Sequence, residues 1–326
     1  MEAAAVIPRS PLQLRVSVTD RCSLRCAYCA PENASVKVAR EEILSYEEIT
    51  RFATAIRAQY GLTQVRLTGG EPLLRAGLDR LVAMLAAVGG FDLALTTNGQ
   101  RLAEMAGPLK LAGLNRLNIS LDSLSPATFA AITHGGSLQR TIDGIVAARR
   151  AGLDPIKLNM VVMRGENDHE VADLVRFAAG HGCQMRFLEL MPIGVAAAGF
   201  ENRFVSSAEV LERMAGEFAL TALPVDPRST SRNFVAEDQS GRWTIIGLIS
   251  PSSRPFCAAC RRLRLTATGV LLGCLARPTG IPIAPLLRRA PELDAEALAA
   301  AVDEALDMKR SDSAFVQPQA MVGIGG

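Results

Sequence analysis

The sequence predicts an α/β protein: a partial (β/α)6 TIM-type barrel followed by a smaller carboxyl-terminal domain. Strand-like runs alternate with helix-like stretches between residues 12 and 220, and this alternation is typical of a parallel sheet. The strand–helix unit occurs six times in this span, whereas a complete barrel has eight units. Hydrophobic residues make up 49% of the 326 residues, which is enough for a sizeable core.

The six expected strands are short apolar runs rich in β-branched residues, at 12–19, 64–69, 92–99, 116–122, 156–163 and 185–191. The clearest helix lies at 47–61, where Ile49, Phe52 and Ile56 have helical spacing and Gly61 marks the end. Later helices are expected to end in glycine-containing turns at Gly113, Gly152 and Gly182.

The pattern changes after about residue 223. Residues 226–234 are loop-like, 242–250 form an expected strand, and 262–275 are typical of a hairpin that turns at Thr268 and Gly269. We therefore expect two domains, residues 1–225 and 226–326.

Charge and composition narrow the class of protein. The net charge of +2 gives no case for a nucleic-acid-binding protein. Except for Lys37, Lys110, Lys157 and Lys309, the basic residues are arginines, whose planar guanidinium suits phosphate and carboxylate. The start of the sequence lacks a signal-peptide pattern, and no apolar stretch reaches the length of a membrane span. We therefore expect a cytoplasmic protein that does not bind membranes, in which clustered cysteines hold metal rather than form disulfides.

The first cysteine group is Cys22, Cys26 and Cys29, in the stretch "CSLRCAYC" that follows the first expected strand. A tetrahedral metal needs four ligands, but this group provides three. Either a zinc ion takes its fourth ligand from elsewhere, or an iron–sulfur cluster keeps one iron open for a ligand that is not protein.

Polar and glycine-rich segments follow the next strands: "TGGEP" at 68–72, "TTNG" at 96–99 and "SLD" at 120–122. Functional sites of parallel α/β folds form beyond the carboxyl ends of the strands. Each segment alone could be an ordinary turn, but together they indicate a site at one end of the barrel.

The second group is Cys257, Cys260 and Cys274, again three potential ligands. A zinc ribbon would need a second C-x2-C pair or a nearby histidine, and the histidines, at 134, 169 and 181, all precede the second domain. Cys183 stands apart and is expected to be a buried thiol. The sequence contains no G-x4-GK[ST] phosphate loop.

"CSLRCAYC" followed by "GGEP" on the next strand resembles the radical S-adenosylmethionine (SAM) enzymes. From Arg15 to the last residue, the chain further resembles the GTP 3′,8-cyclase family of molybdenum cofactor biosynthesis, through its two cysteine triads, the stretch "CAACRRLR" and the final Gly325-Gly326. The resemblance implies a lyase with two [4Fe-4S] clusters. One cluster binds and cleaves SAM, and the other holds the guanine of GTP at its open iron. The resulting radical takes the 3′ hydrogen of GTP, and C3′ then attacks guanine C8.

The resemblance also assigns residues. The metal ligands are Cys22, Cys26, Cys29, Cys257, Cys260 and Cys274. The SAM-binding residues are Tyr28, Gly70, Ser120 and Met191. The GTP-binding residues are Arg15, Arg66, Thr96, Lys157, Arg186, Arg262, Arg264, Gly325 and Gly326. The segment 308–320 departs from the usual family ending.

As partners, the resemblance implies GTP, an external electron donor and a downstream cyclic pyranopterin monophosphate synthase, with the enzyme a monomer or homodimer. Two alternatives remain open at this point. One is a radical SAM enzyme with an auxiliary cluster that acts on a peptide or other substrate. The other is a non-enzymatic zinc- or iron–sulfur-binding regulator.

Overall fold

The computed structural model describes residues 11–31, 38–226, 229–257, 260–289, 293–309, 315 and 317–324. The strands are β1 (Gln13–Ser17), β2 (Gln64–Thr68), β3 (Asp92–Thr97), β4 (Arg116–Ser120), β5 (Ile156–Val162), β6 (Gln184–Glu189), β7 (Phe218–Ala222), β8 (Arg232–Asp238), β9 (Trp243–Ile249), β10 (Arg262–Leu265), β11 (Val270–Leu272) and β12 (Ile281–Pro282). The α-helices are α1 (Tyr46–Tyr60), α2 (Leu78–Val88), α3 (Leu102–Leu111), α4 (Pro126–Thr133), α5 (Leu138–Arg150), α6 (Val171–Gly180), α7 (Phe200–Arg203), α8 (Ser207–Met214), α9 (Ala284–Arg288) and α10 (Ala295–Asp307).

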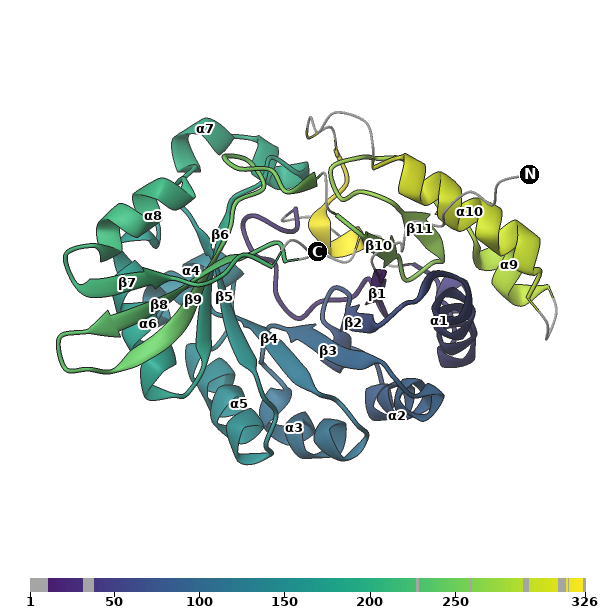
Figure 1. Ribbon diagram of the computed structural model, residues 1–326, viewed down its shortest axis with the longest axis horizontal. Helices are drawn as coiled ribbons and strands as arrows, with labels where there is room; N and C mark the ends of the chain where they lie inside the picture. The colour runs from purple at the N-terminus through teal and green to yellow at the C-terminus, as the bar shows by residue number, and fades with distance from the viewer. Residues whose placement is uncertain are drawn as a thin grey trace, which may run out of the picture.

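Within the described residues, the strands form one sheet in the order β12-β11-β10-β1-β2-β3-β4-β5-β6-β9-β8-β7. Strands β1 to β6 are parallel neighbours. Helices α1, α2, α3 and α5 lie outside the curved sheet (Figure 1). The six predicted β–α units and the partial barrel are therefore confirmed.

Local signals place the helix ends where the sequence predicts them. Helix α1 starts at a capping box in which the Ser45 side chain accepts a hydrogen bond from the Glu48 backbone N–H, and Glu48 accepts one from the Ser45 N–H. It ends at Gly61, whose φ of 66° is left-handed. The glycines after α3, α5 and α6 also have positive φ angles, so the predicted turns are confirmed.

The carboxyl-terminal strands extend the barrel sheet at both edges. Strand β9 pairs parallel with β6, and β10 pairs parallel with β1. The predicted strand at 242–250 and the hairpin turning at Thr268 and Gly269 are confirmed, since β10 and β11 are antiparallel. The loop expected at 226–234 is wrong for its last residues, because β8 begins at Arg232 and pairs with β9. The division near residue 225 remains a prediction.

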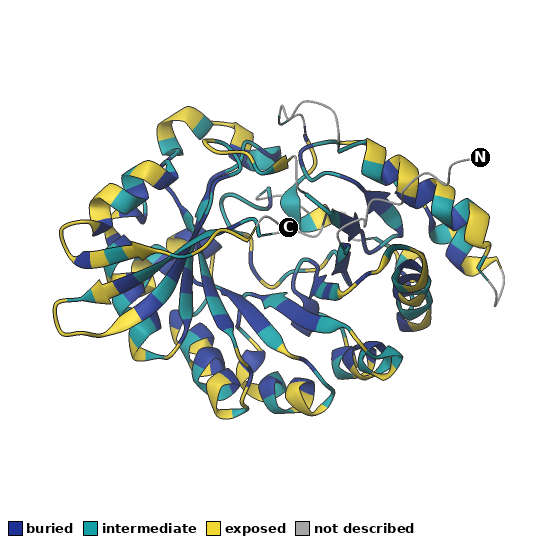
Figure 2. Cartoon of the chain, in the orientation of Figure 1, coloured by how far each residue is buried: buried dark blue, intermediate teal, exposed yellow. Residues whose placement is uncertain are grey.

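Burial alternates along several strands, most clearly β5 and β6 (Figure 2). In β5, for example, Ile156, Leu158 and Met160 are fully buried, whereas Lys157 and Asn159 between them are partly exposed. Successive side chains of a strand point to opposite faces. The apolar set therefore packs toward the helices, and the polar set lines the inside of the barrel. Among the described helices, none is long and apolar enough to cross a bilayer.

Candidate active site

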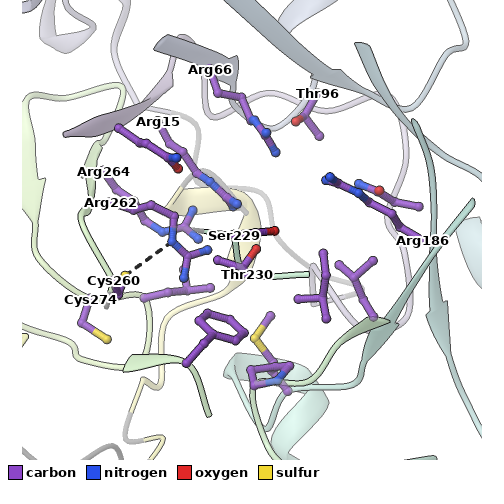
Figure 3. A pocket seen from close by; sticks show the side chains of 18 of the residues that line it. Arg15, Arg66, Thr96, Arg186, Ser229, Thr230, Cys260, Arg262, Arg264 and Cys274 are labelled. Carbon is purple, nitrogen blue, oxygen red and sulfur yellow. Dashed lines mark hydrogen bonds between the residues drawn. The ribbon is translucent and has the colours of Figure 1, made fainter. Parts of the chain in front are cut away.

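A cavity of about 710 Å³ occupies the inside of the barrel. Its walls combine the inner faces of β1 to β6 with the carboxyl-terminal segments. Of the predicted site residues, it is lined by Arg15, Tyr28, Arg66, Thr96, Ser120, Lys157, Arg186, Met191, Cys257, Cys260, Arg262, Arg264 and Cys274. Figure 3 shows the arginines converging from several strands.

Sheet register explains why the basic side chains converge. Arg15 on β1 is paired with Arg66 on β2 and with Arg264 on β10, so three guanidiniums lie side by side across adjacent strands. On the opposite wall, Arg186 on β6 is paired with Asn159 on β5. Strand pairing thus gathers dispersed basic residues into one basic surface, whose guanidiniums have the chemistry to hold anionic groups.

Burial and mutual repulsion lower the pKa values of residues in this basic surface. Burial, and then the charges of Arg264, Arg66 and Arg262, lowers the pKa of Arg15 well below its usual value. Burial, with Arg186, Arg116 and Arg66, lowers the pKa of Lys157 to about 7. Like charges gathered in a poorly hydrated cavity disfavour their own protonation, so a polyanion that enters it would relieve the repulsion.

An ion pair that the sequence did not reveal lies at the start of strands β3 and β4. Arg116 donates from Nε and Nη2 to the carboxylate of Asp92, the first of these at 2.8 Å. Gln64 donates to the same carboxylate at 2.8 Å. All three side chains line the cavity, on the first residues of their strands, so the cavity extends through the barrel to its amino-terminal end. Their convergence depends on the register of β2, β3 and β4, which the individual strand sequences do not contain.

The first cysteine triad follows β1 and is supported by "TGGEP". The backbone N–H of Gly70 donates to the carbonyl of Thr19, and that of Glu71 to the carbonyl of Arg21, both at 2.7 Å. A Cβ at position 70 would lie 2.4 Å from the Arg21 oxygen. Gly70 therefore allows the backbone before Cys22 to approach the end of β2. Gly70 itself is not among the residues that line the cavity.

Glu71 is the centre of this support. Its buried carboxylate accepts hydrogen bonds from the N–H of Leu73, the hydroxyl of Thr97 and the N–H of Asn98, at 2.7–3.0 Å. The Asn98 side chain in turn lies 3.9 Å from the sulfur of Cys22. "TGGEP" and "TTNG", which the sequence analysis placed at the same end of the barrel, are thus joined through one carboxylate.

The three thiols of this triad are partly buried, close enough to one another for their charges to interact. Burial raises the pKa of the Cys22, Cys26 and Cys29 thiols, and the mutual repulsion of the three sulfurs contributes at Cys26 and Cys29. The sulfur of Cys22 accepts the Leu24 N–H at 3.4 Å. Three neighbouring sulfurs that would repel one another as thiolates, with N–H donors around them, fit a cationic iron–sulfur cluster.

Tyr28, between the last two cysteines of this triad, is fixed in place. Its hydroxyl donates to Asp122 at 2.7 Å, and the second Asp122 oxygen accepts the Val161 N–H at 2.9 Å. Burial raises the pKa of Asp122 to about 6. Asp122 is the last residue of the predicted "SLD" segment, so the sequence located the segment but not this contact.

The last described residues of the chain, 321–324, return to the first cysteine triad. The 3₁₀ turn Met321–Gly323 lies within the ring of strands (Figure 1), and a hydrogen bond from the Val322 backbone reaches Cys29. Ile324 is buried in a small apolar cluster with Ile193 and Leu272. The predicted residues Gly325 and Gly326 lie outside the described residues.

The second triad stands on the β10 side of the cavity. The sulfur of Cys260 lies 3.4 Å from Nε of Arg262 and 3.3 Å from Nζ of Lys309. Burial raises the pKa of the Cys260 thiol, but Arg262 and Lys309 outweigh it and bring the value to about 6. Cys274 and Cys257 line the same cavity. These thiols with adjacent cations fit a second cluster. Within the described ranges, no three His, Cys, Asp or Glu residues form a site for a single metal ion.

Further cavity residues were missed by the sequence analysis: Ser229, Thr230, Phe256, Glu189 and Lys309. Glu189 accepts the N–H groups of Ser207, Ser252 and Ser253 at 2.9–3.1 Å, and so anchors the loop that leads to Cys257. No motif marks these residues: Glu189 ends strand β6, and the others come from irregular segments whose path depends on the folded sheet. Cys183 is 2% exposed, which confirms the predicted buried thiol.

Comparison with known proteins agrees with this geometry. Residues 16–178 match the radical SAM superfamily, and residues 183–315 match the family described as Molybdenum Cofactor Synthesis C. The solved structure of Streptococcus suis SuiB bound to precursor peptide SuiA has a TM-score of 0.62 and 13% identity, over 93% of this chain and 67% of that one. The chain is thus a member of the radical SAM superfamily with a molybdenum-cofactor-synthesis carboxyl-terminal region.

Closer relatives define the family. The GTP 3′,8-cyclase of Geobacter sulfurreducens is 45% identical over 278 residues, which is 84% of this chain and 83% of that protein. The GTP 3′,8-cyclase of Ectopseudomonas mendocina is 45% identical over 298 residues, 91% of this chain and 88% of that protein. The chain belongs to the GTP 3′,8-cyclase family, a family of radical SAM lyases.

Proposed function

We propose that this protein converts GTP to (8S)-3′,8-cyclo-7,8-dihydroguanosine 5′-triphosphate, the first step of molybdenum cofactor biosynthesis. The observation that carries the proposal is a single cavity that joins the Tyr28 end of the first triad, a surface of cations and the second cysteine triad. The similarity to GTP 3′,8-cyclases at 45% identity supports this substrate over a peptide.

Residues at the first triad would bind the cofactor. Cys22, Cys26 and Cys29 would hold a [4Fe-4S] cluster, which supplies the electron that cleaves SAM into methionine and a 5′-deoxyadenosyl radical. Ser120 and Met191 line the adjoining wall, where they would contact SAM together with Tyr28. Gly70 would contribute through its backbone. The hydrogen bond from Tyr28 to Asp122 keeps the aromatic ring in one orientation.

Residues on the strands would bind the substrate. Cys257, Cys260 and Cys274 would hold a second [4Fe-4S] cluster with one iron open for guanine. The triphosphate would then lie against the guanidiniums and the ammonium inside the barrel: Arg15, Arg66, Lys157, Arg186, Arg262 and Arg264. Thr96 adds a hydroxyl donor, and Gly325 and Gly326 would approach the nucleotide. Charge-assisted contacts of this kind contribute about 1.5–3 kcal/mol each.

The remaining features of the proposal concern partners. An external donor would reduce the first cluster, and a cyclic pyranopterin monophosphate synthase would consume the product. The protein would act in the cytoplasm as a monomer or homodimer. Residues 1–225 would form the SAM-binding part, and residues 226–326 the part with the second cluster.

Anaerobic reconstitution with iron and sulfide, followed by SAM, reductant and GTP, tests the proposal. We expect 5′-deoxyadenosine and a cyclised nucleotide, and neither product from the Cys26→Ala variant. Wild-type 5′-deoxyadenosine formation by Cys26→Ala would refute the radical SAM assignment of this triad. SAM cleavage without any cyclised nucleotide would instead favour another substrate, such as a peptide.

A further inference from the structure

Lys309 is a partly buried lysine whose ammonium group lies at the second cysteine triad. Its Nζ is 3.3 Å from the sulfur of Cys260 and also donates to the carbonyl oxygen of Arg262. Cys260 therefore has two cationic donors, since Nε of Arg262 approaches the same sulfur at 3.4 Å. Lys309 belongs neither to the cysteine triads nor to the predicted GTP-binding residues.

The backbone that carries Lys309 is held against the triad by close packing. A Cβ at Gly273, the residue before Cys274, would lie 1.9 Å from the carbonyl oxygen of Ala305 in α10. The last turn of α10 therefore touches the backbone beside Cys274, and this approach requires glycine. On the other side, Tyr60 of α1 donates to the carbonyl of Ala299 in α10 at 3.0 Å.

These contacts direct the Lys309 side chain inward. Helix α10 buries Leu298, Val302 and Ala305, and its chain continues as a turn in which the Lys309 N–H donates to the Leu306 carbonyl at 3.3 Å. Lys309 is part of this turn, and its side chain lines the cavity. Removing an ammonium group from water is unfavourable unless it finds polar partners, and here the Cys260 sulfur and the Arg262 carbonyl oxygen provide them.

We propose that Lys309 is a positioning residue for the second cluster: its ammonium donates to the Cys260 sulfur and makes the reduction potential of that cluster less negative. Hydrogen bonds and positive charge at ligand sulfurs favour the reduced, more negative state of an iron–sulfur cluster. The proposal rests on the second cluster of the proposed function. It adds that the end of α10, and not only the β10 arginines, determines the electronic state of this cluster.

Redox titration of the reconstituted full-length protein, followed by electron paramagnetic resonance, tests the proposal. Lys309→Met removes the charge and the donor while keeping an unbranched stem, and Lys309→Arg keeps both. Lys110→Met is the matched control, because Lys110 is exposed on α3. Iron, sulfide and thermal unfolding are measured for every variant.

We expect two midpoint potentials in the wild type, one of which shifts when GTP is added. In Lys309→Met, that GTP-sensitive potential should become more negative while the other stays constant. Lys309→Arg should restore most of the shift, and Lys110→Met should match the wild type. Unchanged potentials in Lys309→Met, or equal shifts of both, would overturn the role of Lys309. Wild-type protein with iron and sulfide for one cluster only would instead overturn the second cluster itself, before any variant is compared.

Discussion

Replacing Gly70 with alanine should displace the first cysteine triad. The new Cβ would lie 2.4 Å from the carbonyl oxygen of Arg21 and 2.5 Å from its carbonyl carbon, whereas ordinary contact begins at 3.4 Å. The backbone next to Cys22 would have to retreat by about 1 Å. Both neighbouring hydrogen bonds, from Gly70 to Thr19 and from Glu71 to Arg21, would lengthen from 2.7 Å.

A displacement of about 1 Å at a reacting site costs on the order of a hundredfold in rate, and overpacking of this kind costs about 1–3 kcal/mol of stability. The assay is the initial rate of 5′-deoxyadenosine formation from SAM and reductant without GTP, with iron content measured in parallel. We expect a loss of about a hundredfold, or loss of one cluster.

The matched control is Gly180→Ala in α6, where the added Cβ would meet nothing within 4 Å. Alanine is favoured over glycine inside helices by about 1 kcal/mol, so this variant should keep full activity and equal or greater stability. If Gly70→Ala cleaved SAM at the wild-type rate with both clusters in place, the steric role assigned to this glycine would be wrong.

Three further predictions concern the nucleotide. Burial and neighbouring cations lower the pKa of Lys157 to about 7, so the free protein loses this charge as the pH rises through 7. GTP affinity, measured by titration calorimetry, should therefore fall toward about pH 9 in the wild type and should fall less in Lys157→Arg. Arg264→Met should weaken GTP binding by about ten- to a hundredfold, yet leave the melting temperature of the nucleotide-free protein equal or higher, because Arg15 and Arg262 lose a repelling neighbour. Removing Gly325 and Gly326 should leave the cluster content unchanged, because Ile324 keeps its buried position. The truncated protein should still cleave SAM slowly, but product analysis should find almost no cyclised nucleotide.

Each of these has an outcome that contradicts it. Parallel pH profiles of the wild type and Lys157→Arg would show that another group titrates. GTP affinity unaffected by Arg264→Met would mean that the triphosphate lies elsewhere. Full cyclase activity after removal of the two glycines would show that the tail does not contribute to the reaction.

The sequence predicted most of the barrel and its functional end because both depend on local signals. Strand alternation, helix-closing glycines such as Gly61, and the cysteine spacing are each contained within about 20 residues of sequence. The predicted basic residues also proved to share one cavity.

What the sequence did not reveal depends on long-range pairing. The extension of the barrel sheet by β9 and β10, the Asp92–Arg116 pair and the contact of Lys309 with Cys260 join residues between 24 and 249 positions apart. The loop expected at 226–234 was partly wrong for the same reason: Arg232 to Phe234 become strand because they pair with β9, and Phe234 also pairs with β7. Edge pairing of this kind leaves little trace in local composition.

The position of β10 beside β1 has a consequence for how this protein could be divided. Expressed alone, residues 1–225 would lack β9 and β10, so β1 and β6 would both present unpaired N–H and C=O groups. Exposed strand edges of this kind promote aggregation and the pairing of one molecule with another. The two predicted parts should therefore fold cooperatively as one unit. Grafting the second triad onto another barrel would require β9 and β10 as well, because the cysteines alone would lack the strand pairing that positions them.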